Sequence, residues 1–242
     1  MTQLILIRHG QSVWNAENKF TGWVDSPLSS QGVSEAKKAG RLIKKNKLII
    51  HKCYTSFLSR AIKTLEILLK ESDNFNLPVN KFWQLNERHY GALTGLNKQQ
   101  TEEQVGSELF LKYRRSWDMA PPEIEIENKS IKLFSELNKT IPRSQIPKTE
   151  SLKDTYERVN QFYKDNISEK LSNRCYIIVA HGNSLRALCK NLFSISDNNI
   201  SKLEIPTGNP MVIKFNDNNL IKSAEYLDNA RALTLPNFLD KI

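Results

Sequence analysis

Two apolar runs of the chain each end abruptly in a histidine and a glycine, and this pattern limits the folds open to it. Leu4–Ile7 leads straight into Arg8-His9-Gly10, and Cys175–Ala180 leads into His181-Gly182. Uninterrupted apolar runs of this length are typical of strands buried on both faces, as in parallel sheets. We therefore expect both runs to form interior strands, with the two histidines in the turns that follow them.

Strand and helix patterns alternate along most of the chain. The sequence predicts strands at Leu4–Ile7, Leu48–Tyr54, Val79–Leu85, Cys175–Ala180, Met211–Phe215 and Ile221–Tyr226. It predicts helices from Ser29 or Ser30 to about Asn46, Leu58 to Lys70, Asn97 to Gly106, Ser107 to Trp117, Ser151 to about Leu171, and directly after His181. This order predicts an α/β fold of three layers (α/β/α) around a mostly parallel central sheet.

Two segments do not fit the alternation. Residues 118–150 contain Pro121, Pro122, Pro142 and Pro147, and the tail 230–242 is short and irregular. We expect a single domain over residues 1–242, with the first segment as a lid-like insertion and the second as a mobile tail.

The charge balance does not indicate a nucleic-acid partner. The 35 basic and 26 acidic residues give a net charge of +9, but the 24 lysines are scattered along the chain rather than clustered. A compositional bias explains this better than a binding patch, so no nucleic acid is expected.

Neither a membrane nor an oxidising compartment is indicated. The longest apolar runs are far too short to span a bilayer, and no basic segment precedes a long apolar run at the N-terminus. The three cysteines are far apart and form no C-x-x-C motif, which argues against a disulfide framework or a zinc site. We expect a cytoplasmic protein.

Charged side chains gather at the predicted strand ends. In open α/β sheets, ligands bind beyond the carboxyl ends of the strands. Four such ends would supply His9 with Arg8, Arg60, Glu87 and His181. The alternatives are that each histidine merely caps its strand, and that Glu87 pairs with Arg88 or a nearby lysine.

These side chains suit phosphoryl transfer. Guanidinium groups make paired bonds to phosphate oxygens, and a neutral imidazole nitrogen can attack phosphorus and leave again. Glu87 could give and take the proton of a substrate hydroxyl. Gly10 would let the backbone approach the phosphate. No acidic cluster with metal spacing accompanies them, so no metal is expected.

The motifs around these residues resemble one known family. They are Leu6–Ser12, Trp14-Asn15, Phe20–Trp23, Tyr54–Ser56, Arg60-Ala61, Leu85–Gly91, Gly95–Lys98, Arg114-Arg115, Ala180–Arg186 and Ile205–Gly208. Over essentially its whole length, the chain resembles the 2,3-bisphosphoglycerate-dependent phosphoglycerate mutases of the histidine phosphatase superfamily. Arg-His-Gly alone indicates only the superfamily. Glu87–Gly91 with Lys98 and the arginine pair is more specific.

The resemblance implies an isomerase of glycolysis and gluconeogenesis that interconverts 2-phosphoglycerate and 3-phosphoglycerate, with 2,3-bisphosphoglycerate as primer. His9 would be the phosphohistidine, Glu87 the acid and base, and His181 a stabiliser of the transferring phosphoryl group. Arg8, Asn15, Arg60 and Asn183 would surround that group. The implied substrate-binding set also includes Gly10, Gln11, Ser12, Thr21, Gly22, Arg88, His89, Tyr90, Lys98, Arg114, Arg115 and Gly182. The family also suggests a homodimer.

The chain departs from the family pattern in three places. Gln11 stands where the family usually has glutamate, residues 123–149 lack the family's usual motif, and the C-terminus lacks a Lys- and Gly-rich tail. The last two departures leave open how the site is closed to water. A phosphatase of the same superfamily, acting on small phosphate esters, is the alternative function.

Overall fold

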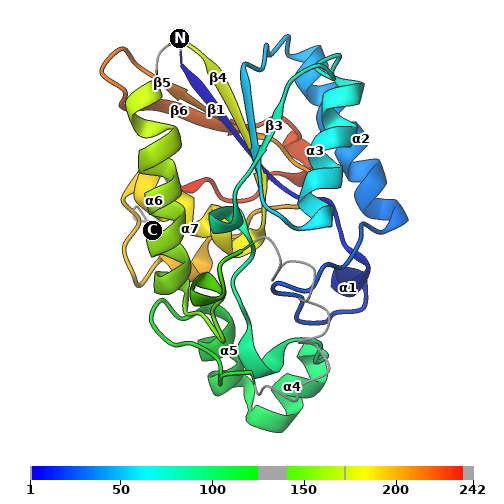
Figure 1. Cartoon of the computed structure of the whole chain (residues 1–242), viewed down its shortest axis with the longest axis vertical. Coiled ribbons are helices and arrows are strands. Elements are labelled where there is room, and N and C mark those ends of the chain that lie inside the picture. Colours follow the sequence, from blue (N-terminus) through cyan, green and yellow to red (C-terminus); the bar gives the residue numbers. More distant parts are fainter. Residues whose placement is uncertain (1, 125–140, 172, 237–242) are drawn as a thin grey trace.

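A mixed sheet of six strands forms the centre of the computed structural model, which describes residues 2–124, 141–171 and 173–236 (Figure 1). The strands are β1 (Gln3–Arg8), β2 (Lys52–Thr55), β3 (Val79–Lys81), β4 (Cys175–Ala180), β5 (Met211–Phe215) and β6 (Ile221–Tyr226), in the order β3-β2-β4-β1-β5-β6. The first four strands of this order pair in parallel, and β5 and β6 add two antiparallel pairings. The predicted mostly parallel sheet is confirmed.

Helices cover both faces of the sheet, which makes three layers. In Figure 1, α2 (Ser30–Lys45) and α3 (Ser59–Glu71) lie on one side, and α6 (Leu152–Asn166) and α7 (Gly182–Phe193) on the other. Leu4 and Leu6 of β1 pack in the core cluster that contains residues of α6 and α7. Ile5 and Ile7 pack with residues of α2 and α3. Burial on both faces explains why this strand is apolar throughout.

Helix starts agree closely with the sequence signals, whereas α6 ends at Asn166 instead of about Leu171. The Ser29 side chain accepts the Gly32 N–H and caps α2, which ends before Asn46. Ser151 and Asp154 form a reciprocal capping box at the start of α6. Such caps satisfy backbone donors that the first turn of a helix leaves without partners.

Two predicted strands are shorter in the structure. β2 begins at Lys52 instead of Leu48, and β3 stops at Lys81 instead of Leu85. After Phe82 the backbone closes into a 3-10 helix, Trp83–Leu85, because the Leu85 N–H bonds the Phe82 carbonyl. This turn takes the chain out of the sheet and toward the carboxyl ends of the neighbouring strands.

Three further helices lie beyond those carboxyl ends (Figure 1). They are α1 (Val13–Ala16), α4 (Lys98–Val105) and α5 (Ser107–Arg115). The sequence predicted α4 and α5 but not α1, whose four residues are too few for a periodic pattern.

The two irregular segments are only partly described. Ile124 and Ile141 flank the undescribed part of 118–150 and are buried in a cluster with Trp23 and Leu58. The residues between them lie outside the described chain, so the lid stays a prediction. In the tail, Arg231 donates to the Thr207 carbonyl over 2.9 Å, and residues 237–242 are also outside the described part.

Gly10 brings β1 close to α2. A Cβ atom on Gly10 would lie 2.2 Å from the Gly32 carbonyl oxygen, and one on Gly32 would lie 2.1 Å from the Gln11 carbonyl oxygen. A residue with a side chain at position 10 would therefore clash with the α2 backbone. The approach of the Gly10 backbone to a phosphate stays a prediction.

None of the helices in the described chain combines the length and apolar character needed to cross a membrane. Cys53, Cys175 and Cys189 are free and buried.

Candidate active site

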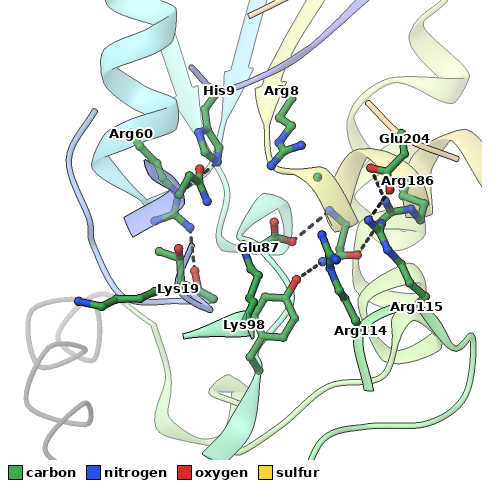
Figure 2. A pocket seen from close by; sticks show the side chains of 16 residues that line it. Arg8, His9, Lys19, Arg60, Glu87, Lys98, Arg114, Arg115, Arg186 and Glu204 are labelled. Carbon is green, nitrogen blue, oxygen red and sulfur yellow. Dashed lines mark hydrogen bonds and ion pairs between the residues drawn. The ribbon is translucent and has the colours of Figure 1, made fainter. Parts of the chain in front are cut away.

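A cationic cavity lies where the carboxyl ends of the parallel strands face α4 and α5 (Figure 2). Its walls are formed by Arg8, His9, Asn15, Lys19, Thr21, Gly22, Arg60, Glu87, Tyr90, Lys98, Arg114, Arg115, Gly182, Asn183, Arg186 and Glu204. The pairing of Arg8 with Ala180 places His9 beside His181, with ring centroids 4.9 Å apart. The strand ends therefore bring their charged residues together, as predicted.

His9 is held as a neutral imidazole. Its Nδ1 lies 2.6 Å from the Gly10 carbonyl oxygen, which can only accept, so Nδ1 carries the proton and Nε2 has the lone pair. Burial lowers the pKa of His9 well below its usual value, and the charges of Arg60 and Arg8 lower it further. The imidazole is therefore uncharged at neutral pH, as attack on phosphorus requires.

Arg60 lies directly against this lone pair. Its Nε is 3.3 Å from His9 Nε2, while Nη1 and Nη2 donate to the carbonyls of Val24 (2.8 Å) and Gly22 (2.7 Å). Burial lowers the pKa of Arg60 to about 10, so the guanidinium stays charged at neutral pH. An anion bound to His9 would meet a cation whose orientation the backbone already fixes.

His181 lies behind His9 and is fully buried. Its Nε2 forms a 2.8 Å hydrogen bond with Ser56 Oγ, and Nδ1 has no hydrogen-bond partner in the described chain. Burial and the charges of Arg60 and His9 lower the pKa of His181 well below its usual value. His181 is thus a second neutral imidazole next to the first.

Glu87 faces the cavity with its carboxylate fixed by the backbone. Oε1 accepts the N–H of Arg88 (2.8 Å) and the N–H of Asn183 (3.1 Å) in the first turn of α7. The Glu87 carbonyl accepts Trp23 Nε1 over 2.6 Å and Arg158 Nη2 over 3.0 Å. Backbone and side chain of the proposed acid and base are therefore both held in place.

Arg158 supports this loop from α6. Its guanidinium pairs with Glu150 over 2.6 Å, and both side chains are buried. Nη1 donates to the Gln84 and Asn86 carbonyls, while Glu150 accepts the His89 N–H over 2.7 Å. The sequence analysis missed Arg158, because one arginine in a polar helix gives no signal of its own.

Lys98, Arg114 and Arg115 line the outer part of the cavity. Burial, together with the nearby Arg114 charge, lowers the pKa of Lys98 to about 8. Neighbouring cations that repel one another without a ligand are typical of a site for a multiply charged anion.

Six residues of the predicted site lie outside the cavity lining, and each has a local structural role. Arg88 is buried behind Tyr90 and donates to the carbonyls of Tyr113 and Arg114 at the end of α5. His89 accepts the Gly91 N–H, and burial lowers its pKa to about 4. Gly10 packs against α2, and the Gln11 side chain accepts a hydrogen bond from Ser29. Ser12 caps α1, and His181 lies beneath His9.

Three lining residues were missed. Arg186 follows Asn183 by three positions on α7, so helical spacing could have indicated it. Lys19 and Glu204 lie in loops, where spacing carries no such information. In the described residues, no group of three or more His, Cys, Asp or Glu side chains is arranged to hold a metal.

Comparison with known proteins places this geometry in a family. The family model of the histidine phosphatase superfamily (branch 1) matches residues 4–132 and 122–224. A 2,3-bisphosphoglycerate-dependent phosphoglycerate mutase of Pelagibacter ubique is 52% identical over 97% of this chain and 99% of its own length. A protein of the same name from Lactobacillus acidophilus is 50% identical over 94% of this chain and 100% of its own length. The chain belongs to the phosphoglycerate mutase family of this superfamily.

Solved structures share the fold of this phosphoglycerate mutase family member. A phosphoglycerate mutase of Bacillus anthracis aligns with a TM-score of 0.67 at 23% identity, covering 93% of this chain and 92% of its own. A mycobacterial glucosyl-3-phosphoglycerate phosphatase aligns with a TM-score of 0.68 at 21% identity, covering 93% and 97%. The fold thus occurs in proteins named as mutases and in proteins named as phosphatases.

Proposed function

We propose that the chain is an isomerase that interconverts 2-phosphoglycerate and 3-phosphoglycerate through a phosphohistidine on His9. One observation carries the proposal: a neutral His9, whose Nε2 bears the lone pair and accepts from Arg60 Nε, and a backbone-fixed Glu87 line the same cation-rich cavity. The curated relatives with about half of their residues identical bear the name of this reaction.

The residues present fit 2,3-bisphosphoglycerate as the primer. The ligand carries two phosphates and a carboxylate, and the cavity offers Arg8 and Arg60 near His9 and Lys98, Arg114 and Arg115 farther out. When bound, it supplies the phosphoryl group. His9 Nε2 attacks phosphorus as the phosphorus–oxygen ester bond breaks, and Arg60 stabilises the charge on the phosphoryl oxygens.

Glu87 manages the proton in each half of the reaction. It protonates the substrate oxygen that leaves phosphorus when His9 becomes phosphorylated. When a monophosphoglycerate hydroxyl then attacks the phosphohistidine, Glu87 takes the hydroxyl proton and His9 regains its lone pair. This attack forms 2,3-bisphosphoglycerate. When the bisphosphate then returns its original phosphoryl group to His9, the isomer is left and the phosphohistidine is restored, so each cycle balances.

His181 completes the pair of imidazoles. We propose that His181 stabilises the transferring phosphoryl group from behind His9, because the two imidazole rings are adjacent and His181 adds no competing charge.

The decisive experiment combines labelling with product analysis. Phosphoryl label from 2,3-bisphosphoglycerate should be lost in acid and kept in alkali, as expected of phosphohistidine, and His9→Ala should abolish label and isomerisation together. Incubation of 3-phosphoglycerate with primer should give the isomer. Free phosphate as the main product would favour the phosphatase alternative instead, and activity lost in chelator would contradict a metal-free mechanism.

We also propose a homodimer in the cytoplasm. Ile49 and Phe75, exposed at 73% and 66%, lie in the segments that lead into the neighbouring strands β2 and β3. Large exposed apolar side chains favour a partner surface. Three free, buried cysteines are in keeping with a reducing compartment.

A further inference from the structure

Glu204 lies at the outer wall of the cavity and bridges two of its arginines (Figure 2). Oε1 bonds Arg115 Nη2, and Oε2 lies 3.7 Å from Arg186 Nη2. The proposed mechanism gives this carboxylate no role. Glu204 nevertheless forms an ion pair with the Arg115 guanidinium, which an anionic ligand would need.

The two acidic side chains of the cavity lining differ in their freedom to move. Glu87 is buried and bonded to two backbone N–H groups, whereas the Glu204 side chain is 47% exposed. Its partner Arg115 is 19% exposed, and Arg186 is 5% exposed and fixed by the Leu203 carbonyl and by Asn183. Glu204 can therefore turn into water while both arginines stay in the wall.

We propose that Glu204 is an internal competitor for Arg115 that sets how tightly the site holds anions. This inference rests on the proposed function. Without ligand, Glu204 neutralises part of the crowded positive charge formed by Arg114, Arg115 and Arg186. When a ligand carboxylate or outer phosphate arrives, Glu204 gives up the bond to Arg115 and its charge repels the ligand.

The gain in ligand affinity from removing the Glu204 charge should increase with the negative charge that the ligand places at the outer wall of the cavity. A unit charge about 6 Å from another in a water-like dielectric changes binding about three-fold. Replacing Glu204 with glutamine should therefore tighten binding of 3-phosphoglycerate about three-fold. It should tighten binding of 2,3-bisphosphoglycerate, with its additional phosphate, about ten-fold. Inorganic phosphate, bound near His9 and Arg60, should change less than two-fold.

The test compares Glu204→Gln with a matched control, Glu225→Gln. Glu225 is also about half exposed and pairs with Lys214 over 2.7 Å on the β5–β6 hairpin, away from the cavity. Calorimetry gives the Kd of 3-phosphoglycerate and of inorganic phosphate. Initial rates give kcat, KM, and the concentration of 2,3-bisphosphoglycerate for half-maximal activity. We expect lower KM and half-maximal concentration for Glu204→Gln, kcat within two-fold, and no change in the control.

A double variant tests the route through Arg115. In an Arg115→Ala background, the gain from Glu204→Gln should be smaller than in the wild-type background, because the contested guanidinium is absent and only the repulsion between Glu204 and the ligand remains. Unchanged or weaker ligand binding in Glu204→Gln, or an equal gain in the control, would overturn the inference. A wild-type protein that binds these ligands without isomerising them would instead reject the proposed function, and the measured Kd values would still decide the role of Glu204.

Discussion

The lowered pKa of Lys98 gives a prediction for the pH dependence of catalysis. Burial, with Arg114 and Arg8 nearby, lowers this pKa to about 8. The ammonium charge is thus present below pH 8 and lost above it. Because Lys98 lines the outer cavity, its charge should strengthen substrate binding only below that pH.

The magnitude follows from the titration. At one pH unit above the pKa, about one tenth of the lysines remain charged, so kcat/KM should fall about ten-fold per unit above pH 8 if only the charged form binds well. This fall with rising pH is the alkaline limb of the profile. In kcat the alkaline limb should lie at higher pH than in kcat/KM, because a bound anion favours the ammonium form. A guanidinium stays charged throughout, so Lys98→Arg should remove the limb near pH 8.

The assay is a series of initial rates from pH 6 to pH 10 at several 3-phosphoglycerate concentrations, for wild type and Lys98→Arg. A direct titration of the wild-type Kd for 3-phosphoglycerate covers the case in which arginine does not fit. A limb that persists in Lys98→Arg, or a wild-type Kd that is flat between pH 7 and pH 9, would refute the reasoning.

Two further predictions concern the structure around Glu87. The pKa of His89 is lowered to about 4, below about 6.5 in the unfolded chain, so stability is present above pH 6.5 and falls by about 3 kcal/mol toward pH 4. His89→Asn keeps an acceptor for the Gly91 N–H. Its free energy of unfolding in urea should fall less than that of the wild type between pH 6.5 and pH 4. Equal falls in the two proteins would contradict the assignment of this pH dependence to His89. Arg158→Met leaves Glu150 buried without its partner and should cost about 3–5 kcal/mol and lower kcat more than it raises KM, with Glu150→Gln restoring part of the stability. An unchanged melting temperature in Arg158→Met would disprove the role of this ion pair.

The sequence predicted most accurately the strands that are buried along their whole length. β1 and β4 are buried on both faces, so their apolar runs end where the strands end, and the histidines that follow were placed correctly. β2 and β3 were predicted too long, because apolar residues continue into turns that pack on the core without pairing in the sheet.

Side chains that act through tertiary contacts were beyond the sequence analysis. His89, Arg88 and His181 belong to the recognised motifs, yet only the fold shows that they lie behind the cavity lining. Arg158 reaches Glu87 from a helix about 70 residues later in the chain, and Glu204 reaches Arg115 from a loop. No local pattern encodes such pairings, because they depend on how separate elements are packed together.

The pairing of β1 with β4 has a consequence for synthesis of the chain. His9 is made almost first, but its neighbour His181 comes directly after β4, which starts at Cys175, and the two histidines are aligned by the register Arg8–Ala180. A slip of one residue would turn one histidine to the opposite face of the sheet. On the ribosome, β1 must therefore wait for about three quarters of the protein before its central neighbour exists. A nascent or truncated chain that ends before β4 has His9, the proposed nucleophile, but no formed site. Phosphorylation of His9 would therefore report that β1 and β4 have paired.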